Sequence, residues 1–286
     1  MKKITTFAAA VATFATTTFA APTFYFTAIP DENSDRLEER FGGIAKYLES
    51  KLDVTVKYIP VKSYSASVSA FKNNRVQLAW FGGLSGVKAR VAVPGSTAIA
   101  QGAEDVQFKS YIIAHTSLGL EKSSTLTEKI KGNTFTFGSK GSTSGRLMPE
   151  FYLRKAFAAS PEDAFKKVGF SGDHSKTISL VESGAYLVGA VNYSVWDKGV
   201  AAGTIDTSKV EVIWETPTYP DYNWSVRADV DKTWGAGFTA KVTNALLSLK
   251  DEKLLASFPR SSFIPVEDGA YDPIIKTAQQ LGIIRK

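Results

Sequence analysis

Strand-like and helix-like segments alternate along the first third of the chain. Residues 24–29 combine aromatic and β-branched side chains and are followed by Pro30, which is typical of a strand that ends in a turn. Between residues 34 and 52 apolar side chains recur at helical spacing, which predicts an amphipathic helix with Asn33 or Ser34 as its cap. Further strands are expected at 54–59 and 76–81, and further helices at 64–71 and 84–93. This βαβαβ order predicts a parallel sheet covered by helices.

A second alternation follows an extended segment at residues 110–115, which we expect to leave the first part of the fold. Strands are expected at 131–138, 165–170 and 187–191, and helices at 148–158, 240–249 and 272–281. Residues 210–214 and 223–227 alternate as strands around a turn-rich stretch, which we interpret as a return crossing. Two crossings predict two α/β lobes joined by a hinge, with a ligand held between them. Because ligands of parallel sheets lie beyond the carboxyl ends of the strands, the candidate cleft segments are 30–33, 62–64 and 81–84.

The N-terminus has the pattern of an export signal. Lys2 and Lys3 precede an uncharged apolar run at 7–19, which ends in the small-x-small pattern Thr18-Phe19-Ala20. The run is too short and too rich in threonine for a membrane anchor, and no later stretch is apolar over the length that a bilayer requires. We therefore expect cleavage after Ala20 and a soluble mature chain. The expected limits are a signal peptide at 1–20, a first lobe at 21–110, a second lobe at 111–215, and a return crossing with the rest of the first lobe at 216–286.

Composition narrows the classes of function. The chain contains no cysteine, which excludes thiol catalysis, cysteine-ligated metals, disulfides and an acylated N-terminal cysteine. An exported chain without a lipid anchor fits the periplasm. The formal net charge is +6, but Lys and Arg alternate with Asp and Glu, which argues against a nucleic-acid partner. The two histidines do not have the spacing of metal ligands, so we predict neither a metal nor another cofactor.

The stretch at residues 137–146 contains the most informative pattern. The hydroxyl cluster Ser142, Thr143 and Ser144 stands between two glycines, after an expected strand and ahead of an expected helix. Free N–H groups at a helix start, hydroxyl donors, and glycines that permit close approach together suit an anion. The alternative is that Ser142 or Ser144 only caps the helix, and the spacing alone does not separate the two. Lys140 precedes the cluster, so the pattern is not a nucleotide-binding P-loop.

Together with later segments, this stretch resembles a known family. The run from Ser142 to Gly145 with Pro149, the turn Ser171-Gly172-Asp173-His174 and the segment 184–196 are similar to the phosphonate/phosphite-binding (PhnD-like) family of ABC-transporter solute-binding proteins. The likeness extends from about Thr23 to the C-terminal region. It implies an α/β fold of the type II periplasmic-binding-protein class, in which two lobes are joined by two crossing strands and the ligand lies in the cleft.

The resemblance also implies the residues of the site. Ser142, Thr143 and Ser144 would grip a tetrahedral head group, and His174 would donate one further hydrogen bond. The family also contributes an aromatic residue from the first lobe and an acidic or amide group near the second crossing. The positions that match by order of occurrence are Tyr64 and Asp221, with Tyr111, Asn192 and Asn223 as neighbouring alternatives.

Asp221 bears on which oxyanion is bound. A carboxylate next to an oxyanion is repulsive unless a proton lies between them, so a cleft-lining Asp221 favours protonated phosphate, phosphite or phosphonate over fully ionised sulfate or selenate. The alternative is that Asp221 braces the proline-rich turn at 216–224. That turn is richer in aromatic residues than the usual phosphonate-binding pattern and resembles a branch of selenate-binding proteins, which leaves the identity of the oxyanion open.

The expected function is that of a periplasmic solute-binding component of an ABC importer. Such a protein, expected here as a monomer, captures a small tetrahedral oxyanion by lobe closure and delivers it to the permease and its ATPase. One alternative is a binding protein that presents its ligand to a receptor. Another is an enzyme on the same fold, which we do not expect, because the hydroxyl cluster places no serine in the register of a nucleophile elbow. His115 lies in the extended segment among apolar residues and is expected to be structural.

Overall fold

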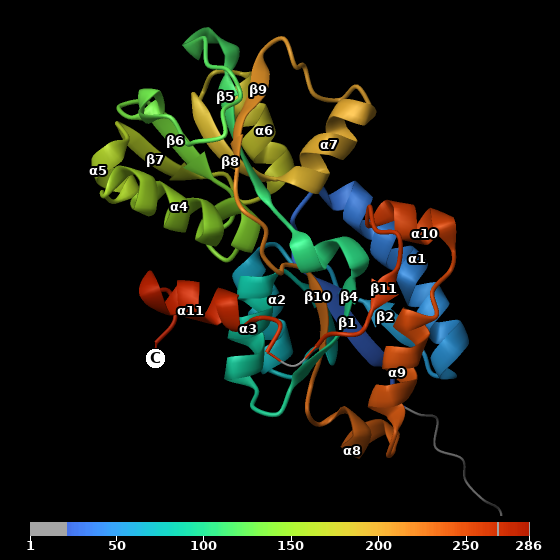
Figure 1. Cartoon of the computed structure of the whole chain (residues 1–286). Helices are drawn as coiled ribbons and strands as arrows, with labels where there is room; N and C mark the ends of the chain where they lie inside the picture. Colours follow the sequence, from blue (N-terminus) through green and yellow to red (C-terminus); the bar gives the residue numbers. More distant parts are fainter. Residues whose placement is uncertain (1–21, 268, 286) are drawn as a thin grey trace, which may run out of the picture.

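Two sheets divide the structure into two lobes (Figure 1). The computed structural model describes residues 22–267 and 269–285, so the predicted signal peptide lies outside the described residues. One sheet has six strands in the order β11-β4-β10-β3-β1-β2, and the other has five strands in the order β7-β6-β8-β5-β9. We call the six-stranded sheet with its helices the first lobe, and the five-stranded sheet with its helices the second lobe.

The first lobe is built from both ends of the chain. Its strands are β1 (Phe24–Ala28), β2 (Val56–Tyr58), β3 (Leu78–Phe81), β4 (Thr97–Gly102), β10 (Asn223–Val226) and β11 (Phe263–Ile264). Its helices are α1 (Ser34–Leu52), α2 (Tyr64–Lys72), α3 (Gly83–Ala92), α8 (Val230–Trp234), α9 (Phe238–Leu247), α10 (Glu252–Ser257) and α11 (Asp272–Gln280). Strand β1 pairs in parallel with β2 and β3, as the βαβαβ order predicts, whereas β10 is antiparallel to β3 and β4.

The second lobe is built from the middle of the chain. Its strands are β5 (Ser110–His115), β6 (Thr134–Phe137), β7 (Lys167–Phe170), β8 (Val188–Asn192) and β9 (Val210–Glu215). Its helices are α4 (Met148–Phe157), α5 (Pro161–Ala164), α6 (His174–Glu182) and α7 (Tyr193–Ala201), with short helical turns η2 (Thr116–Leu118), η3 (Glu128–Ile130) and η4 (Thr143–Leu147). Strand β6 is parallel to β7 and β8, and β5 is antiparallel to β8 and β9.

Helix α1 fixes the turn that follows β1. Its cap is Asn33, whose side-chain oxygen accepts a hydrogen bond from the N–H of Arg36 over 3.1 Å. Phe41 and Ile44 are fully buried in the core of the lobe, and burial of each such side chain contributes about 1.5–3 kcal/mol. The turn between the strand and the helix is therefore held at the carboxyl end of the sheet, where a ligand is expected.

Two segments of the chain cross between the lobes as a ribbon. Phe108 and Tyr219 form an antiparallel bridge, with N–O distances of 2.9 Å in both directions. Next to it, the Thr216 N–H donates to the carbonyl oxygen of Ser110, and the Ser110 N–H donates to the Thr216 hydroxyl, each over 3.0 Å. The first crossing also contains the short helix η1 (Ala103–Gln107). This ribbon supports the predicted hinge, while the lobe limits 21–110, 111–215 and 216–286 stay a prediction.

The sequence pattern does not predict strands β4 and β11. Strand β4 has the sequence Thr-Ala-Ile-Ala-Gln-Gly, which is poor in the residues that favour strands, and β11 is only two residues long. Both are held by pairing with neighbours, β4 with β10 and β11 with β4. Long-range pairing therefore decides their conformation.

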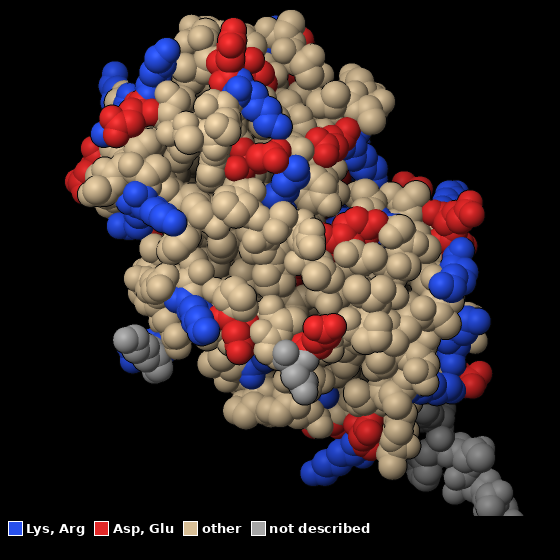
Figure 2. Space-filling model, in the orientation of Figure 1, with Lys and Arg blue, Asp and Glu red and all other residues tan. Residues whose placement is uncertain are grey.

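The outer surface carries charges of both signs. On the face shown in Figure 2, Lys and Arg side chains are interspersed with Asp and Glu over both lobes. Among the helices in residues 22–267 and 269–285, none combines the length and the apolarity that a bilayer crossing demands.

Candidate functional site

Four buried polar atoms lie at the boundary between the lobes without a hydrogen-bond partner in the described part of the chain. They are Asp31 Oδ1, Tyr64 Oη, His174 Nε2 and Asp221 Oδ2. All four side chains are at most 3% exposed. Burial raises the pKa of Tyr64, and the negative charges of Asp31 and Asp221 raise it further, so these groups are close neighbours. Because one unpaired buried polar group costs about 1–3 kcal/mol, their arrangement indicates a site for a polar ligand.

The hydroxyl cluster Ser142, Thr143 and Ser144 lies next to these four groups. Ser142, Thr143 and Ser144 are buried at the start of η4, and the hydroxyls of Thr143 and Ser144 lie near the Asp221 carboxyl, where they partly offset the rise in its pKa that burial causes. The Ser142 hydroxyl also lies near Tyr64, where it partly offsets the rise in the pKa of that phenol. We call these seven residues the buried cluster: Asp31, Tyr64, Ser142, Thr143, Ser144, His174 and Asp221.

The turn η4 explains how three hydroxyls come to share one place. The oxygen of Ser142 accepts a hydrogen bond from the N–H of Gly145 over 2.8 Å, so Ser142 is the helix cap that the sequence left as an alternative. Thr143 Oγ1 accepts from the N–H of Leu84 over 3.0 Å, across the lobe boundary. The protons of the Ser142 and Thr143 hydroxyls remain able to donate, because in both bonds the hydroxyl oxygen is the acceptor.

His174 is a neutral donor at this site. It is the first residue of α6, is fully buried, and its pKa is lowered to about 4 by burial. Its Nδ1 accepts a hydrogen bond from the N–H of Asn192 over 3.3 Å. A neutral imidazole that accepts at Nδ1 carries its proton on Nε2, which is the nitrogen without a partner. His174 therefore directs an N–H toward the buried cluster.

Asp221 is a carboxyl group that holds a proton easily. Burial raises its pKa to about 7, although a hydrogen bond from the Gly83 N–H acts in the opposite direction. That bond joins the N–H to Oδ1 over 2.8 Å at the start of α3, and Oδ2 has no partner in the described chain. Asp221 thus bonds the start of α3 through one oxygen, while the other stays unpartnered, and both Asp221 Oδ1 and Thr143 Oγ1 lie near Gly82.

Asp31 is a second carboxyl group that the sequence analysis did not single out. It lies directly beyond β1, in the segment 30–33 that the sequence named only as a candidate part of the cleft. Burial raises its pKa to about 6, partly offset by the positive charge of Arg40. Its carbonyl oxygen accepts a hydrogen bond from the N–H of His174 over 3.0 Å, which joins the two lobes. The signal that could have found it is its position, because it is an acidic residue at the carboxyl end of a parallel strand.

The structure places the other sequence candidates differently. The Tyr111 hydroxyl donates to Asp197 over 3.5 Å, and its ring packs in a separate core of the second lobe, so the structure does not bring it to the buried cluster. Ser110, its neighbour on β5, donates to the carbonyl oxygen of Ser144 over 2.7 Å. Since successive side chains of a strand point to opposite faces, Tyr111 faces away from the cluster.

The side chains of the two asparagines bond to residues outside the buried cluster. Asn192 accepts from the Val195 N–H as the cap of α7 and donates to the Tyr222 hydroxyl over 2.9 Å. The oxygen of Asn223 accepts from Arg90 over 3.1 Å. The side chains of both asparagines are therefore engaged within the protein.

Comparison with known proteins identifies the family of the chain. A model of the periplasmic substrate-binding proteins of phosphonate ABC transporters matches residues 26–271. Over 265 residues, 90% of this chain and 89% of its relative, the chain is 42% identical to the probable ABC transporter phosphite-binding protein PhnD1 of Prochlorococcus marinus (strain MIT 9301).

Solved structures agree with this match. The structure of PhnD1 from Prochlorococcus marinus (MIT 9301) in complex with methylphosphonate has a TM-score of 0.88 at 41% identity, over 92% of this chain and 99% of that chain. A binding-protein component of an ABC phosphonate transporter from Pseudomonas aeruginosa has a TM-score of 0.80 at 21% identity, over 91% of this chain and 86% of that chain, and bears on the fold alone.

These findings confirm the predicted fold class and family. The two α/β lobes match structures of the type II periplasmic-binding-protein fold. The chain is homologous to phosphonate- and phosphite-binding components of ABC transporters, as the hydroxyl run and the histidine turn had indicated. The chain belongs to the family of periplasmic phosphonate-binding proteins of ABC transporters.

Proposed function

We propose that the protein captures a small phosphorus oxyanion, of the phosphonate or phosphite class, in the periplasm and delivers it to an ABC permease driven by its ATPase. The ligand's tetrahedral head binds in the buried cluster. Its oxygens accept hydrogen bonds from Ser142, Thr143, Ser144 and His174, and Tyr64 and the two carboxyl groups complete the site. Tyr111 and Asn192, which the sequence also named, are left out of the contact set because their polar atoms are engaged elsewhere.

One observation carries this proposal: neutral donors and a protonatable carboxyl group meet in one buried place. His174 directs an N–H into the cluster, and the Asp221 carboxyl has a pKa of about 7. Neutral donors bind an anion without a competing counter-charge, and a buried site strengthens each of these hydrogen bonds. The match to a relative solved with methylphosphonate supports the same class of ligand.

The carboxyl groups favour phosphorus over sulfur or selenium. Phosphonate and phosphite hold a proton near neutral pH, and that proton can lie between a ligand oxygen and Asp221 Oδ2. Sulfate and selenate are fully ionised, so a carboxylate at the same place repels them unless it takes up a proton itself. Asp31, with a pKa of about 6, adds to this selection.

Capture proceeds by closure of the lobes about the crossing ribbon. In this structure three hydrogen bonds join the lobes around the cluster: Leu84 N–H to Thr143, His174 N–H to Asp31, and Asn192 to Tyr222. A bound oxyanion that contacts residues of both lobes stabilises this closed arrangement relative to an open one. The closed form is the state that the permease recognises.

The same geometry argues against an enzyme. A histidine that activates a serine must accept its proton, but His174 presents a protonated Nε2 to the cluster. The Ser142 oxygen is also held by the Gly145 N–H as a helix cap. The serines and the histidine therefore act as hydrogen-bond donors to a bound ligand.

A thermal-unfolding screen against oxyanions tests the proposal. The chain from residue 21 onward is heated with methylphosphonate, phosphite, phosphate, sulfate or selenate in a buffer without these ions. A ligand at a hundred times its Kd stabilises the folded state by about 2.7 kcal/mol, so methylphosphonate or phosphite should raise the Tm by several degrees. Absence of a shift with every phosphorus oxyanion would overturn the proposal.

The Asp221→Asn variant tests the selection among anions. The amide oxygen keeps an acceptor for the Gly83 N–H, while the negative charge is lost. We expect the difference in affinity between methylphosphonate and sulfate to become smaller than in the wild-type protein. An unchanged difference would show that Asp221 does not select the ligand.

A further inference from the structure

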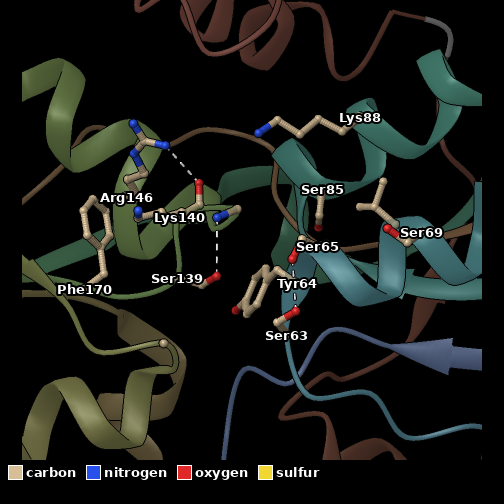
Figure 3. Close-up of a pocket in the computed structure, with 13 residues that line it drawn as sticks. Ser63, Tyr64, Ser65, Ser69, Ser85, Lys88, Ser139, Lys140, Arg146 and Phe170 are labelled. Atoms are coloured by element: carbon tan, nitrogen blue, oxygen red, sulfur yellow. Dashed lines mark hydrogen bonds between the residues drawn. The ribbon is translucent and has the colours of Figure 1, made fainter.

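A second, open pocket lies against the buried cluster at the mouth of the cleft (Figure 3). Its volume is about 560 Å³, and residues of both lobes line it. From the first lobe come Ser63, Tyr64, Ser65, Val68, Ser69, Ser85 and Lys88, and from the second lobe come Ser139, Lys140, Gly141, Arg146, Phe170 and Gly172. We call this the basic pocket.

The lining of the pocket is cationic. Lys88, Lys140 and Arg146 line it, and no Asp or Glu is among the described residues that do so. Arg146 pairs with Glu150 over 3.1 Å, but Glu150 also pairs with Arg154, so the three together carry one net positive charge. Lys88 and Lys140 have no ion pair within the described residues. The lining of the pocket therefore has an excess of positive charge, which would face any group bound there.

The charges come from opposite sides of the cleft. Lys88 extends from α3 of the first lobe toward the second lobe, where Arg146 lies in η4, directly before α4 (Figure 3). Burial lowers the pKa of Lys88, and the positive charge of Arg146 lowers it further. Closure thus brings like charges together, which opposes the closed state until an anion lies between them.

Further donors face the same space. Ser63 is the cap of the nine-residue helix α2, and Ser63, Tyr64 and Ser65 at its first turn all line the pocket. The N-terminal end of a helix favours negative charge. Ser85 and Ser139 add hydroxyl groups from the two lobes. The pocket thus combines cations, hydroxyls and a helix N-terminus, as an anion site requires.

A thin layer separates the basic pocket from the buried cluster. Tyr64 belongs to both, because it lines the pocket while its hydroxyl is one of the four unpartnered atoms. Gly141 lines the pocket, and the next residue, Ser142, belongs to the cluster. A short chain on a ligand bound in the cluster therefore reaches the pocket once the side chain of Tyr64 turns aside.

We propose that the basic pocket binds a second anionic group, a carboxylate or phosphoryl group, in addition to the oxyanion of the buried cluster. The inference rests on the proposed function and names its substrate class: phosphonates that carry a further acidic group on a short chain. A free carboxylate or phosphate could supply the same chemistry, and the experiment separates the two sources. The second anion also neutralises the like charges that closure brings together.

Titration calorimetry at fixed ionic strength tests this. Carboxyalkylphosphonates with one, two and three methylene groups are compared with alkylphosphonates of equal length, and methylphosphonate is also titrated in the presence of excess acetate. We expect at least one carboxylated ligand to bind about tenfold more tightly than its uncharged counterpart, the effect of one charge-assisted hydrogen bond. If acetate instead tightens the binding of methylphosphonate, the second anion is a free one.

Two variants assign the effect to the pocket. Lys88→Gln should remove most of the tenfold advantage, and because it also relieves the repulsion between Lys88 and Arg146, methylphosphonate affinity should be equal to that of wild type or up to about twofold higher. Lys46→Gln, at an exposed position of α1 that does not line the pocket, removes the same charge and should preserve the advantage.

The outcomes are distinct. If methylphosphonate binds but neither an attached nor a free carboxylate improves binding, the pocket is not an anion site. If the advantage survives in Lys88→Gln, it arises elsewhere and the inference is wrong. If wild-type protein binds no phosphonate at all, the proposed function itself fails.

Discussion

The backbone N–H of Asn192 donates to Nδ1 of His174 over 3.3 Å, and this bond fixes which nitrogen of the imidazole faces the buried cluster. Because the ring is neutral, Nε2 holds the proton and donates. His174→Leu removes that donor. We expect the Kd for methylphosphonate to rise by about 10- to 100-fold, which equals a loss of about 1.5–3 kcal/mol in the free energy of binding. His174→Gln, whose amide can place an N–H near Nε2, should lose less.

The other histidine provides the control for that measurement. His115 lies at the end of β5, where its Nδ1 bonds with Ser117. We expect His115→Leu to bind methylphosphonate as the wild type does. Equal affinities of His174→Leu and wild type in calorimetry would exclude His174 from the site.

Close approach at Gly145 leads to a second prediction. A Cβ atom at this position would lie 3.0 Å from Cε1 of His174 and 3.2 Å from the Cα of Gly138. The backbone of Gly138 cannot yield, because its N–H donates to the Gly145 carbonyl over 2.8 Å. We expect Gly145→Ala to destabilise the protein by about 1–3 kcal/mol in urea unfolding and to weaken methylphosphonate binding.

Gly42 is the matched control for this substitution. It lies within α1, and a Cβ there meets nothing within 4 Å. Gly42→Ala should leave binding unchanged and stabilise the protein by up to about 1 kcal/mol, because alanine favours a helix. If both alanine variants behave alike, the contact at Gly145 is not what shapes the site.

The raised pKa of Asp221 predicts a pH dependence of stability. Burial raises its pKa from the ordinary 3.8 to about 7 in the folded state, so between these two pH values the folded protein holds a proton that the unfolded chain releases. This bound proton adds to the free energy of unfolding in full below about pH 4. The contribution falls as the pH rises and is lost above about pH 7. Asp221→Asn lacks this loss.

The measurement compares unfolding of the two proteins in phosphate-free buffer. We expect the free energy of unfolding of Asp221→Asn, relative to wild type, to increase from pH 5 to pH 8 by on the order of 2 kcal/mol. A difference that stays constant over this range would show that the carboxyl group titrates normally in the folded protein.

A buried ion pair holds the first crossing to the rest of the first lobe. Arg260 donates to both oxygens of Asp105 over 2.6 and 2.7 Å, and Asp105 is fully buried. Arg260→Met leaves a buried carboxylate without its partner and should cost about 3–5 kcal/mol in the free energy of unfolding. Arg154→Met, which removes a partly exposed partner of Glu150, should cost less than about 1 kcal/mol. Similar costs for both variants would contradict this role.

Local pattern was enough to predict much of the fold. The alternation of strand and helix signals places β1, α1 and β3 correctly, and Asn33 was one of the two predicted caps of α1. The strands that escape prediction, β4 and β11, lack strong local preference and depend on partners far away in the sequence. Hydrophobic periodicity contains no information about such pairing.

The sequence predicted some residues of the site and missed others, because local motifs can be recognised in a sequence and long-range arrangement cannot. The hydroxyl run and the histidine turn are local motifs, and the structure brings Ser142, Thr143, Ser144 and His174 together. Asp31 and Tyr111 depend on which way a side chain points once the sheets have formed. Asp31 is buried at the end of β1 beside the cluster, whereas the alternation of β5 turns Tyr111 to the opposite face.

The most direct test of the account is calorimetric titration of methylphosphonate into wild type, Thr143→Val and Thr136→Val. Thr143→Val keeps the shape but removes a hydroxyl of the buried cluster, whereas Thr136 is a buried threonine of β6 whose hydroxyl donates only to the carbonyl oxygen of Phe137 on the same strand. We predict saturable binding of methylphosphonate by wild type and Thr136→Val. In Thr143→Val the free energy of binding should weaken by about 1.5–3 kcal/mol. Equal affinity of all three proteins would contradict the placement of the ligand in the buried cluster.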